Sequence, residues 1–140
     1  MTLDEIAATL PNGFHDAELQ TVAIDYPTSE ARLILDLWIG DMGGTEAERE
    51  SYRLAEVTLS GLAFWISEPP DARYPYSDIG AHRIDIGSVD TLKSKRPAEL
   101  PPAPIGTFTN WIYVTDWNAF IYFAAKRASL EWRGAATLRH

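Results

Sequence analysis

The chain contains no cysteine among its 140 residues. This absence excludes disulfide bonds, a thiolate nucleophile and a zinc site built on cysteine ligands. It also gives no support to an extracellular location, where small domains are often disulfide-bonded. The stability of the protein must therefore come from a hydrophobic core.

Long apolar runs and a basic N-terminal segment are also lacking. The longest apolar candidates, Leu62–Ile66 and Ala119–Ala125, have the length of strands, far short of the roughly 20 residues that cross a bilayer. The opening residues, Met1–Glu5, include two acids and no base, unlike a secretory signal. These absences predict a cytoplasmic protein without a membrane segment.

Motifs for nucleotide binding and for a serine nucleophile are missing. The glycine-rich segment 40–44 lacks the Lys-Ser/Thr pair of a P-loop and does not fit the Rossmann fingerprint. No Gly-x-Ser-x-Gly elbow occurs in the chain. Segment 40–44 therefore predicts a turn that ends a strand, and the sequence indicates neither a cofactor nor a catalytic residue.

Basic residues are few: 12 against 20 acids, for a net charge of −8. Residues 1–60 hold 12 acids and 3 bases, whereas residues 61–140 hold 8 acids and 9 bases. The late bases lie near Trp111, Trp117 and Trp132, a mixture that can bind single strands. The overall charge nevertheless opposes phosphate binding and predicts no nucleic-acid partner. The acids of residues 16–56 favour a basic protein partner, with a simple solvated face as the alternative.

The chain is rich in apolar and aromatic residues. Apolar residues make up 46%, including five Trp, six Tyr and five Phe, which is enough for a core at a common single-domain length. We therefore predict one domain over residues 1–140. Seven of the nine prolines lie in residues 68–104, which predicts an irregular Pro-rich segment of a length that is often functional.

A short helix is predicted at residues 2–10. Thr2 can cap it, and its apolar residues, including Leu3 and Ile6, fall on one face. Pro11-Asn12-Gly13 then ends it. Such a helix is too short to be stable alone and must pack on the rest of the domain.

The remaining periodicity is that of strands. Alternation predicts a hairpin of residues 21–26 and 33–39, a strand at 82–89, and a second hairpin of 119–124 and 129–133 after a strand at 108–115. Residues 52–59 and 62–67 predict two strands bent at Gly61 or one long bulged strand. A helix over residues 46–59 is the competing prediction, but the β-branched Val57 and Thr58 favour a strand. Strands without intervening helices pair antiparallel. The predicted fold is mainly β, an antiparallel two-layer sandwich or strongly curved sheet with one short N-terminal helix.

The doublet His15-Asp16 is the first candidate site. Metal-dependent phosphohydrolases use such a doublet, but their chemistry needs another histidine upstream, and this chain has only His15, His82 and His140. A simpler metal site of His15, Asp16 and His82 is chemically suitable, although their spacing fits no short motif. The structural alternative is that Asp16 accepts hydrogen bonds from the turn at residues 12–14. We therefore predict no metal site and keep His15 and Asp16 as ligand-binding or partner-binding candidates.

Trp117 is the second candidate. The segment Asp116-Trp117-Asn118 lies between two predicted strands, and Asp and Asn suit a turn with unusual backbone angles. Tryptophan is favoured at interface hot spots. Trp117 is therefore predicted to contact a partner from this turn.

The segment from Pro11 to Ala17, with sequence Pro-Asn-Gly-Phe-His-Asp-Ala, and the strand that ends at Tyr26 resemble the opening of several small bacterial β-rich families. Residues 55–61 and Asp116-Trp117 are in keeping with this pattern. These families include proteins assigned as immunity proteins of polymorphic toxin systems. The resemblance implies a β-rich cytoplasmic domain with a protein-binding role, and it carries over no catalytic residue.

Two functional hypotheses follow. The first is a non-enzymatic, immunity-type domain that neutralises a basic partner through its acidic residues. The second is a small enzyme or ligand-binding domain with a pocket near His15 and Asp16. Exposed edge strands invite pairing, so the sequence leaves the oligomeric state open.

Overall fold

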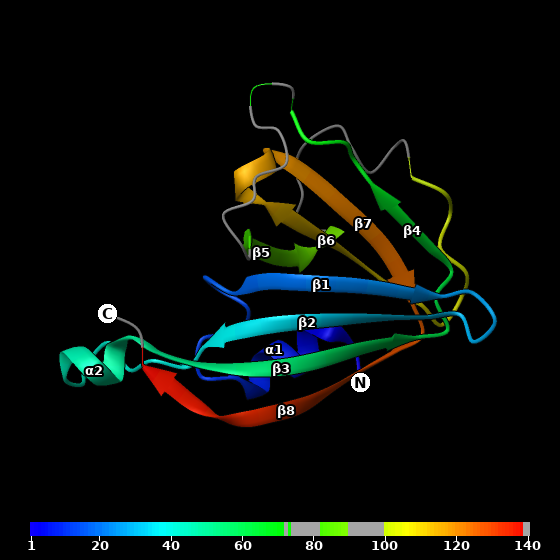
Figure 1. Ribbon diagram of the computed structural model, residues 1–140. Coiled ribbons are helices and arrows are strands. Elements are labelled where there is room, and N and C mark those ends of the chain that lie inside the picture. Colours follow the sequence, from blue (N-terminus) through cyan, green and yellow to red (C-terminus); the bar gives the residue numbers. More distant parts are fainter. Residues whose placement is uncertain (72, 74–81, 90–99, 139–140) are drawn as a thin grey trace.

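The computed structural model describes residues 1–71, 73, 82–89 and 100–138, and this part of the chain is mainly β (Figure 1). Eight antiparallel strands in the described residues form one sheet in the order β4-β7-β6-β5-β1-β2-β3-β8. The strands are β1 (Glu18–Asp25), β2 (Glu30–Trp38), β3 (Ser51–Ser60), β4 (Phe64–Ser67), β5 (His82–Ser88), β6 (Phe108–Val114), β7 (Ala119–Ala125) and β8 (Arg127–Leu138). The helical elements are α1 (Leu3–Thr9), α2 (Glu46–Arg49) and the 3-10 turn η3 (Thr115–Trp117).

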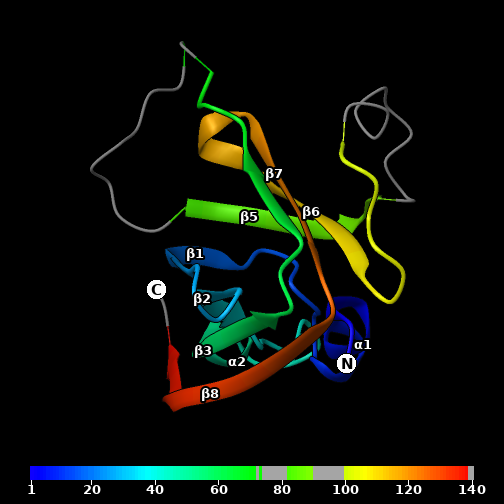
Figure 2. The same cartoon turned by 90° about the vertical axis from the view of Figure 1, so that its right-hand side faces the viewer.

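The predicted fold class is confirmed, because the sheet is so strongly curved that its halves face each other. Figure 2 shows β1, β2, β3 and β8 below, with β5, β6, β7 and β4 above. The halves are joined where Glu18 and Leu19 of β1 pair with Arg83 and His82 of β5. Parts of the predicted Pro-rich segment, residues 72, 74–81 and 90–99, lie outside the described residues, while β5 within it confirms the predicted strand at 82–89.

A bend at Gly61 carries the chain from the lower half to the upper half. Gly61 has a φ of +64°, a conformation that favours glycine. Beside it, the backbone N–H of Lys126 donates to the carbonyl of Ser60 (2.9 Å), and that of Ala63 donates to the carbonyl of Ala124 (2.8 Å). The segments β3–β4 and β7–β8 therefore cross between the halves together, and the prediction of two strands bent at Gly61 is confirmed.

The predicted hairpin of residues 119–124 and 129–133 is wrong. The chain does not reverse at Lys126; instead β7 pairs with β4 and β6, and β8 pairs with β3. The backbone groups of β7 form hydrogen bonds in the upper half of the sheet, whereas those of β8 form hydrogen bonds with β3 in the lower half. The short turn at Lys126 is therefore a corner between the two halves. The other predicted hairpin is confirmed as β1 and β2.

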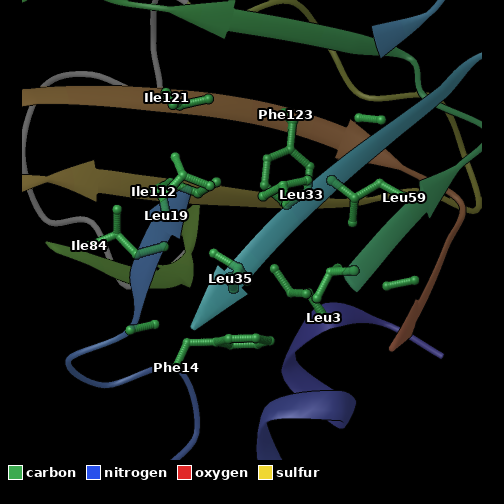
Figure 3. Close-up of a cluster of buried hydrophobic side chains, with 14 of the residues drawn as sticks. Leu3, Phe14, Leu19, Leu33, Leu35, Leu59, Ile84, Ile112, Ile121 and Phe123 are labelled. Atoms are coloured by element: carbon green, nitrogen blue, oxygen red, sulfur yellow. The ribbon is translucent and has the colours of Figure 1, made fainter. Parts of the chain in front are cut away.

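The core lies between the two halves of the sheet. Alternate residues of β2 and β3 point inward and meet alternate residues of β6 and β7 (Figure 3). The fully buried side chains include Leu33, Leu35, Val57, Leu59, Ile84, Ile112, Val114 and Phe123. Burying one such side chain contributes about 1.5–3 kcal/mol, so the period-two alternation supplies most of the driving force for the fold.

Helix α1 covers one end of this core, as its apolar face predicted. Thr2 and Glu5 form a capping box, in which the Thr2 hydroxyl accepts from the Glu5 N–H (3.1 Å). Leu3 and Ile6 are buried, and α1 contacts β8. Within the described residues, neither α-helix has the length and apolar character needed to cross a membrane.

Candidate functional site

The predicted doublet lies in the turn that leads into β1. The backbone N–H of His15 donates to the carbonyl of Asn12 (3.1 Å), and that of Ala17 donates to the carbonyl of Phe14 (3.1 Å). Asp16 has a φ of +56°, which an aspartate tolerates better than most residues. Within the described turn, no hydrogen bond from residues 12–14 reaches the Asp16 carboxylate. The expectation that Asp16 caps this turn is therefore wrong.

The side chains of the doublet form a loose ionic cluster at the surface. The His15 side chain is 66% exposed, and its Nε2 lies 3.6 Å from Oδ2 of Asp16. Asp16 Oδ1 lies 4.0 Å from Nε of Arg83 at the start of β5. Exposed pairs of this kind contribute roughly 0–1 kcal/mol to stability, so they leave the charges available to a ligand.

Trp117 lies in η3, as the turn prediction required, and packs on a histidine. The rings of Trp117 and His82 are 5.0 Å apart and meet edge to face. His82 Nδ1 lies 2.9 Å from Oδ2 of Asp116. The turn closes at Asn118, which has a left-handed φ of +48°. Trp117 is thus held against the side chain that begins β5.

The start of β5 brings all three predicted residues to one end of the sheet. His82 and Arg83 are consecutive; His82 contacts Trp117, and Arg83 approaches Asp16. Sequence reasoning missed Asp116 as the partner of His82, because the pair is 34 residues apart in the chain. We refer to His15, Asp16, His82, Arg83, Asp116 and Trp117 as the β5 cluster.

The chemistry of the β5 cluster is that of a histidine held by a carboxylate. The His82 side chain is 16% exposed, and an imidazole oriented in this way is suited to proton transfer. The described residues contain no group of three or more His, Asp and Glu side chains that could hold a metal ion. His15, Asp16 and His82 therefore do not assemble as metal ligands.

Asp71 adds a third carboxylate, beside the two of the cluster. Its backbone N–H donates to the carbonyl of Trp117 (2.9 Å). Hydrogen bonds from the side chain and the backbone N–H of Arg73 lower the pKa of Asp71 from 3.8 to about 2. This carboxylate is consequently ionised at neutral pH and forms an ion pair with Arg73 beside Trp117.

The outer face of β1, β2, β3 and β8 carries directly opposed acids. We call this surface the acidic face. Its cross-strand pairs are Asp25 with Glu30, Glu18 with Asp36, and Glu56 with Glu131. Like charges directly opposite each other destabilise a sheet by roughly 0.2–1 kcal/mol per pair.

An arginine contacts one acid in two of these pairs. Arg32 lies 3.5 Å from Glu30, and Arg133 pairs with Glu56. The Asp25–Glu30 and Glu56–Glu131 groups therefore each combine two carboxylates with one guanidinium.

The aromatic residues of β6 and β7 form cross-strand pairs on the outer side of the upper half. Phe120 packs on Tyr113 at a ring distance of 4.9 Å and on Trp111 at 5.9 Å. Trp111 Nε1 also donates to the carbonyl of Ser88 (2.9 Å). Trp111 is therefore held within the sheet by a cross-strand ring contact and a hydrogen bond to the backbone.

Several grooves of the described residues lie away from the β5 cluster. One of about 650 Å³ lies between α1 and β8 and is lined by residues that include Ile6, Leu10, Leu130 and Trp132. Another, of about 460 Å³, lies between the start of α1 and the ends of β5 and β6. Two smaller ones, of about 410 and 250 Å³, adjoin the β1–β2 turn around Tyr26. Among these four, the groove between α1 and β8 has the greatest volume.

Comparison of the chain with protein-family models, with curated proteins and with solved structures gives no match. Function is therefore inferred from the geometry of the residues themselves.

Proposed function

We propose that this protein is a non-enzymatic, cytoplasmic binding domain of the immunity-protein type, and that its acidic face engages a basic protein partner. The observation that carries the proposal is the set of three cross-strand acid pairs on one face of one half of the sheet. Each pair weakens the isolated domain, and a cation from a partner would relieve the repulsion.

The charge count at two of the acid pairs supports this proposal. With two carboxylates and one arginine, the Asp25–Glu30 and Glu56–Glu131 groups each have a net charge of −1 and can take one further cation. The side chain of Glu56 is only 12% exposed, and Asp36 is 8% exposed. Charges screened less by water attract a partner more strongly.

The proposal is tested by reversing two exposed acids of the face. The tagged protein is used to capture partners from a lysate of its source cells, and a captured basic protein is purified for titration calorimetry. Asp25→Lys combined with Glu131→Lys should weaken that binding by at least about tenfold at low ionic strength, mostly through slower association. The effect should shrink as salt is added.

A matched control separates the acidic face from net charge. Glu46→Lys combined with Asp85→Lys gives the same net charge but reverses exposed acids that lie off the face. This double variant should bind the partner within about twofold of the original protein, because the two reversed charges lie outside the proposed contact surface. Equal weakening by both double variants, or the absence of any basic partner, would overturn the proposal.

The second candidate function, a small enzyme or ligand-binding domain near His15 and Asp16, is favoured by one observation. His82 is 16% exposed and lies 2.9 Å from Asp116, and a carboxylate partner of this kind orients an imidazole for proton transfer. Native mass spectrometry of the purified protein tests this alternative. A bound small molecule that is lost in His82→Gln would support it, whereas an unliganded mass in both proteins would count against it.

A further inference from the structure

The strand β8 forms one edge of the sheet, and part of that edge is open. In the sheet order, β8 has a single neighbour, β3. The N–H of Ala128 points away from β3, since it donates to the carbonyl of Met1 (2.7 Å). Alternate residues of an antiparallel strand direct their backbone groups to the same side. The backbone groups of Leu130 and Trp132 therefore also face the open edge.

Nothing in the described part of the chain pairs with those groups. Among residues 1–71, 73, 82–89 and 100–138, no strand lies beyond β8, and no backbone hydrogen bond reaches Leu130 or Trp132 from outside the sheet. The groove of about 650 Å³ lies along this side of β8, with Ile6 and Leu10 of α1 on its opposite wall. The carbonyl of Met1 already accepts one backbone hydrogen bond at one end of this edge.

We propose that this edge binds an extended segment of the basic partner, which adds a strand to β8. Such strand addition takes its affinity from main-chain hydrogen bonds and its specificity from alternate side chains. The inference rests on the proposed function, because it specifies how the basic partner binds.

The register defines the side chains of the incoming segment. Residues that pair with Leu130 and Trp132 point into the groove, so they are apolar. The residue between them lies opposite Glu131 and points to the acidic face, so it is basic. Glu131 already lies opposite Glu56, and Arg133 pairs with Glu56. A cation beside Glu131 would neutralise the negative charge that remains on this acid pair. The edge thus fits an apolar–basic–apolar segment.

Glu131 also argues against a second copy of this chain as the occupant. Antiparallel pairing of two β8 edges through Leu130 and Trp132 places Glu131 opposite its own copy. That position is a non-hydrogen-bonded pair, in which side chains approach most closely. The two carboxylates would repel each other, as charged residues on natural edge strands do to prevent self-association.

The test uses a designed peptide, acetyl-Ser-Thr-Val-Lys-Val-Thr-Ser-amide, added to the full chain labelled with nitrogen-15. The amide resonances of Leu130 and Trp132 should shift in a saturable way. Replacing the peptide lysine by glutamate should weaken binding by at least about tenfold at low salt, and Glu131→Lys should reverse that preference.

Backbone methylation supplies a matched control that leaves the protein unchanged. Methylating the amide nitrogens of both valines removes the donors that face β8, so binding should be lost. Methylating the lysine nitrogen instead alters a donor that faces away from β8, and binding should persist. Equal loss with both methylated peptides, or unshifted Leu130 and Trp132 amides, would overturn strand addition.

The remaining outcomes separate this inference from the proposed function. If the captured basic partner depends on Asp25 and Glu131 but leaves the Leu130 and Trp132 amides unshifted, the acidic face stands and strand addition fails. If the peptide binds as expected and no basic partner is found, the edge site stands and the proposed function fails. If sedimentation shows a dimer that protects the same two amides, a second copy occupies the edge and the inference is overturned.

Discussion

Removing the buried amide of Asn110 should loosen α1 from the sheet. Asn110 lies on the inner side of β6 and is 1% exposed. Its Nδ2 donates to Oδ1 of Asp4 in α1 (3.0 Å) and to the carbonyl of Gly87 in β5 (3.0 Å). One side chain thus ties the N-terminal helix to two neighbouring strands.

The magnitude follows from these two bonds. A hydrogen bond to a charged group contributes about 1.5–3 kcal/mol and one to a neutral carbonyl about 0.5–1.5 kcal/mol. Asn110→Ala should therefore lower the free energy of unfolding by about 2–4.5 kcal/mol. That is a large fraction of the roughly 5–15 kcal/mol that stabilises a typical domain.

The assay is urea denaturation followed by tryptophan fluorescence, with a double-mutant cycle. Asp4→Ala and Asn110→Ala together should cost less than the sum of the single changes, by about 1–2 kcal/mol, because they remove the same bond. Gln20→Ala, which removes an exposed amide of β1, should cost less than about 0.5 kcal/mol. A cost for Asn110→Ala as small as that of Gln20→Ala, or full additivity with Asp4→Ala, would refute the reasoning.

Three further predictions concern stability and titration. Leu35→Ala removes a fully buried side chain and should cost about 2–5 kcal/mol in urea denaturation, whereas Val22→Ala at the surface should cost less than about 0.5 kcal/mol. Thr2→Ala removes the helix cap and should cost about 1 kcal/mol in a thermal melt. NMR titration should give Asp71 a pKa of about 2, rising toward 3.8 in Arg73→Gln. Because the folded-state pKa is depressed, the contribution of Asp71 to stability is present above about pH 3.8 and is lost as the pH falls toward 2.

Several features could be predicted from the sequence because they depend on neighbours in the chain. The alternation of apolar residues predicted β1, β2 and β3, since the side chains of a strand point to opposite faces in turn. Thr2 predicted the start of α1, because capping depends on residues within one helical turn. The turn around Trp117 was likewise a local property of its flanking Asp and Asn.

Other features depended on which strands become neighbours. The signals at 119–124 and 129–133 were correct as strands, but their pairing followed from β3 and β4, which precede them by more than 50 residues. His82 meets Asp116 and Arg83 meets Asp16 only because β5 lies between β1 and β6. Strand order of this kind is a long-range choice that periodicity does not encode.

The acidic residues show the same division. Their number, and their concentration in residues 1–60, are properties of the sequence. Only the register of the folded sheet sets Asp25 against Glu30 and Glu56 against Glu131. A shift of one residue would turn these side chains to the other face, so composition determined the charge of this protein, and tertiary pairing decided where that charge is concentrated.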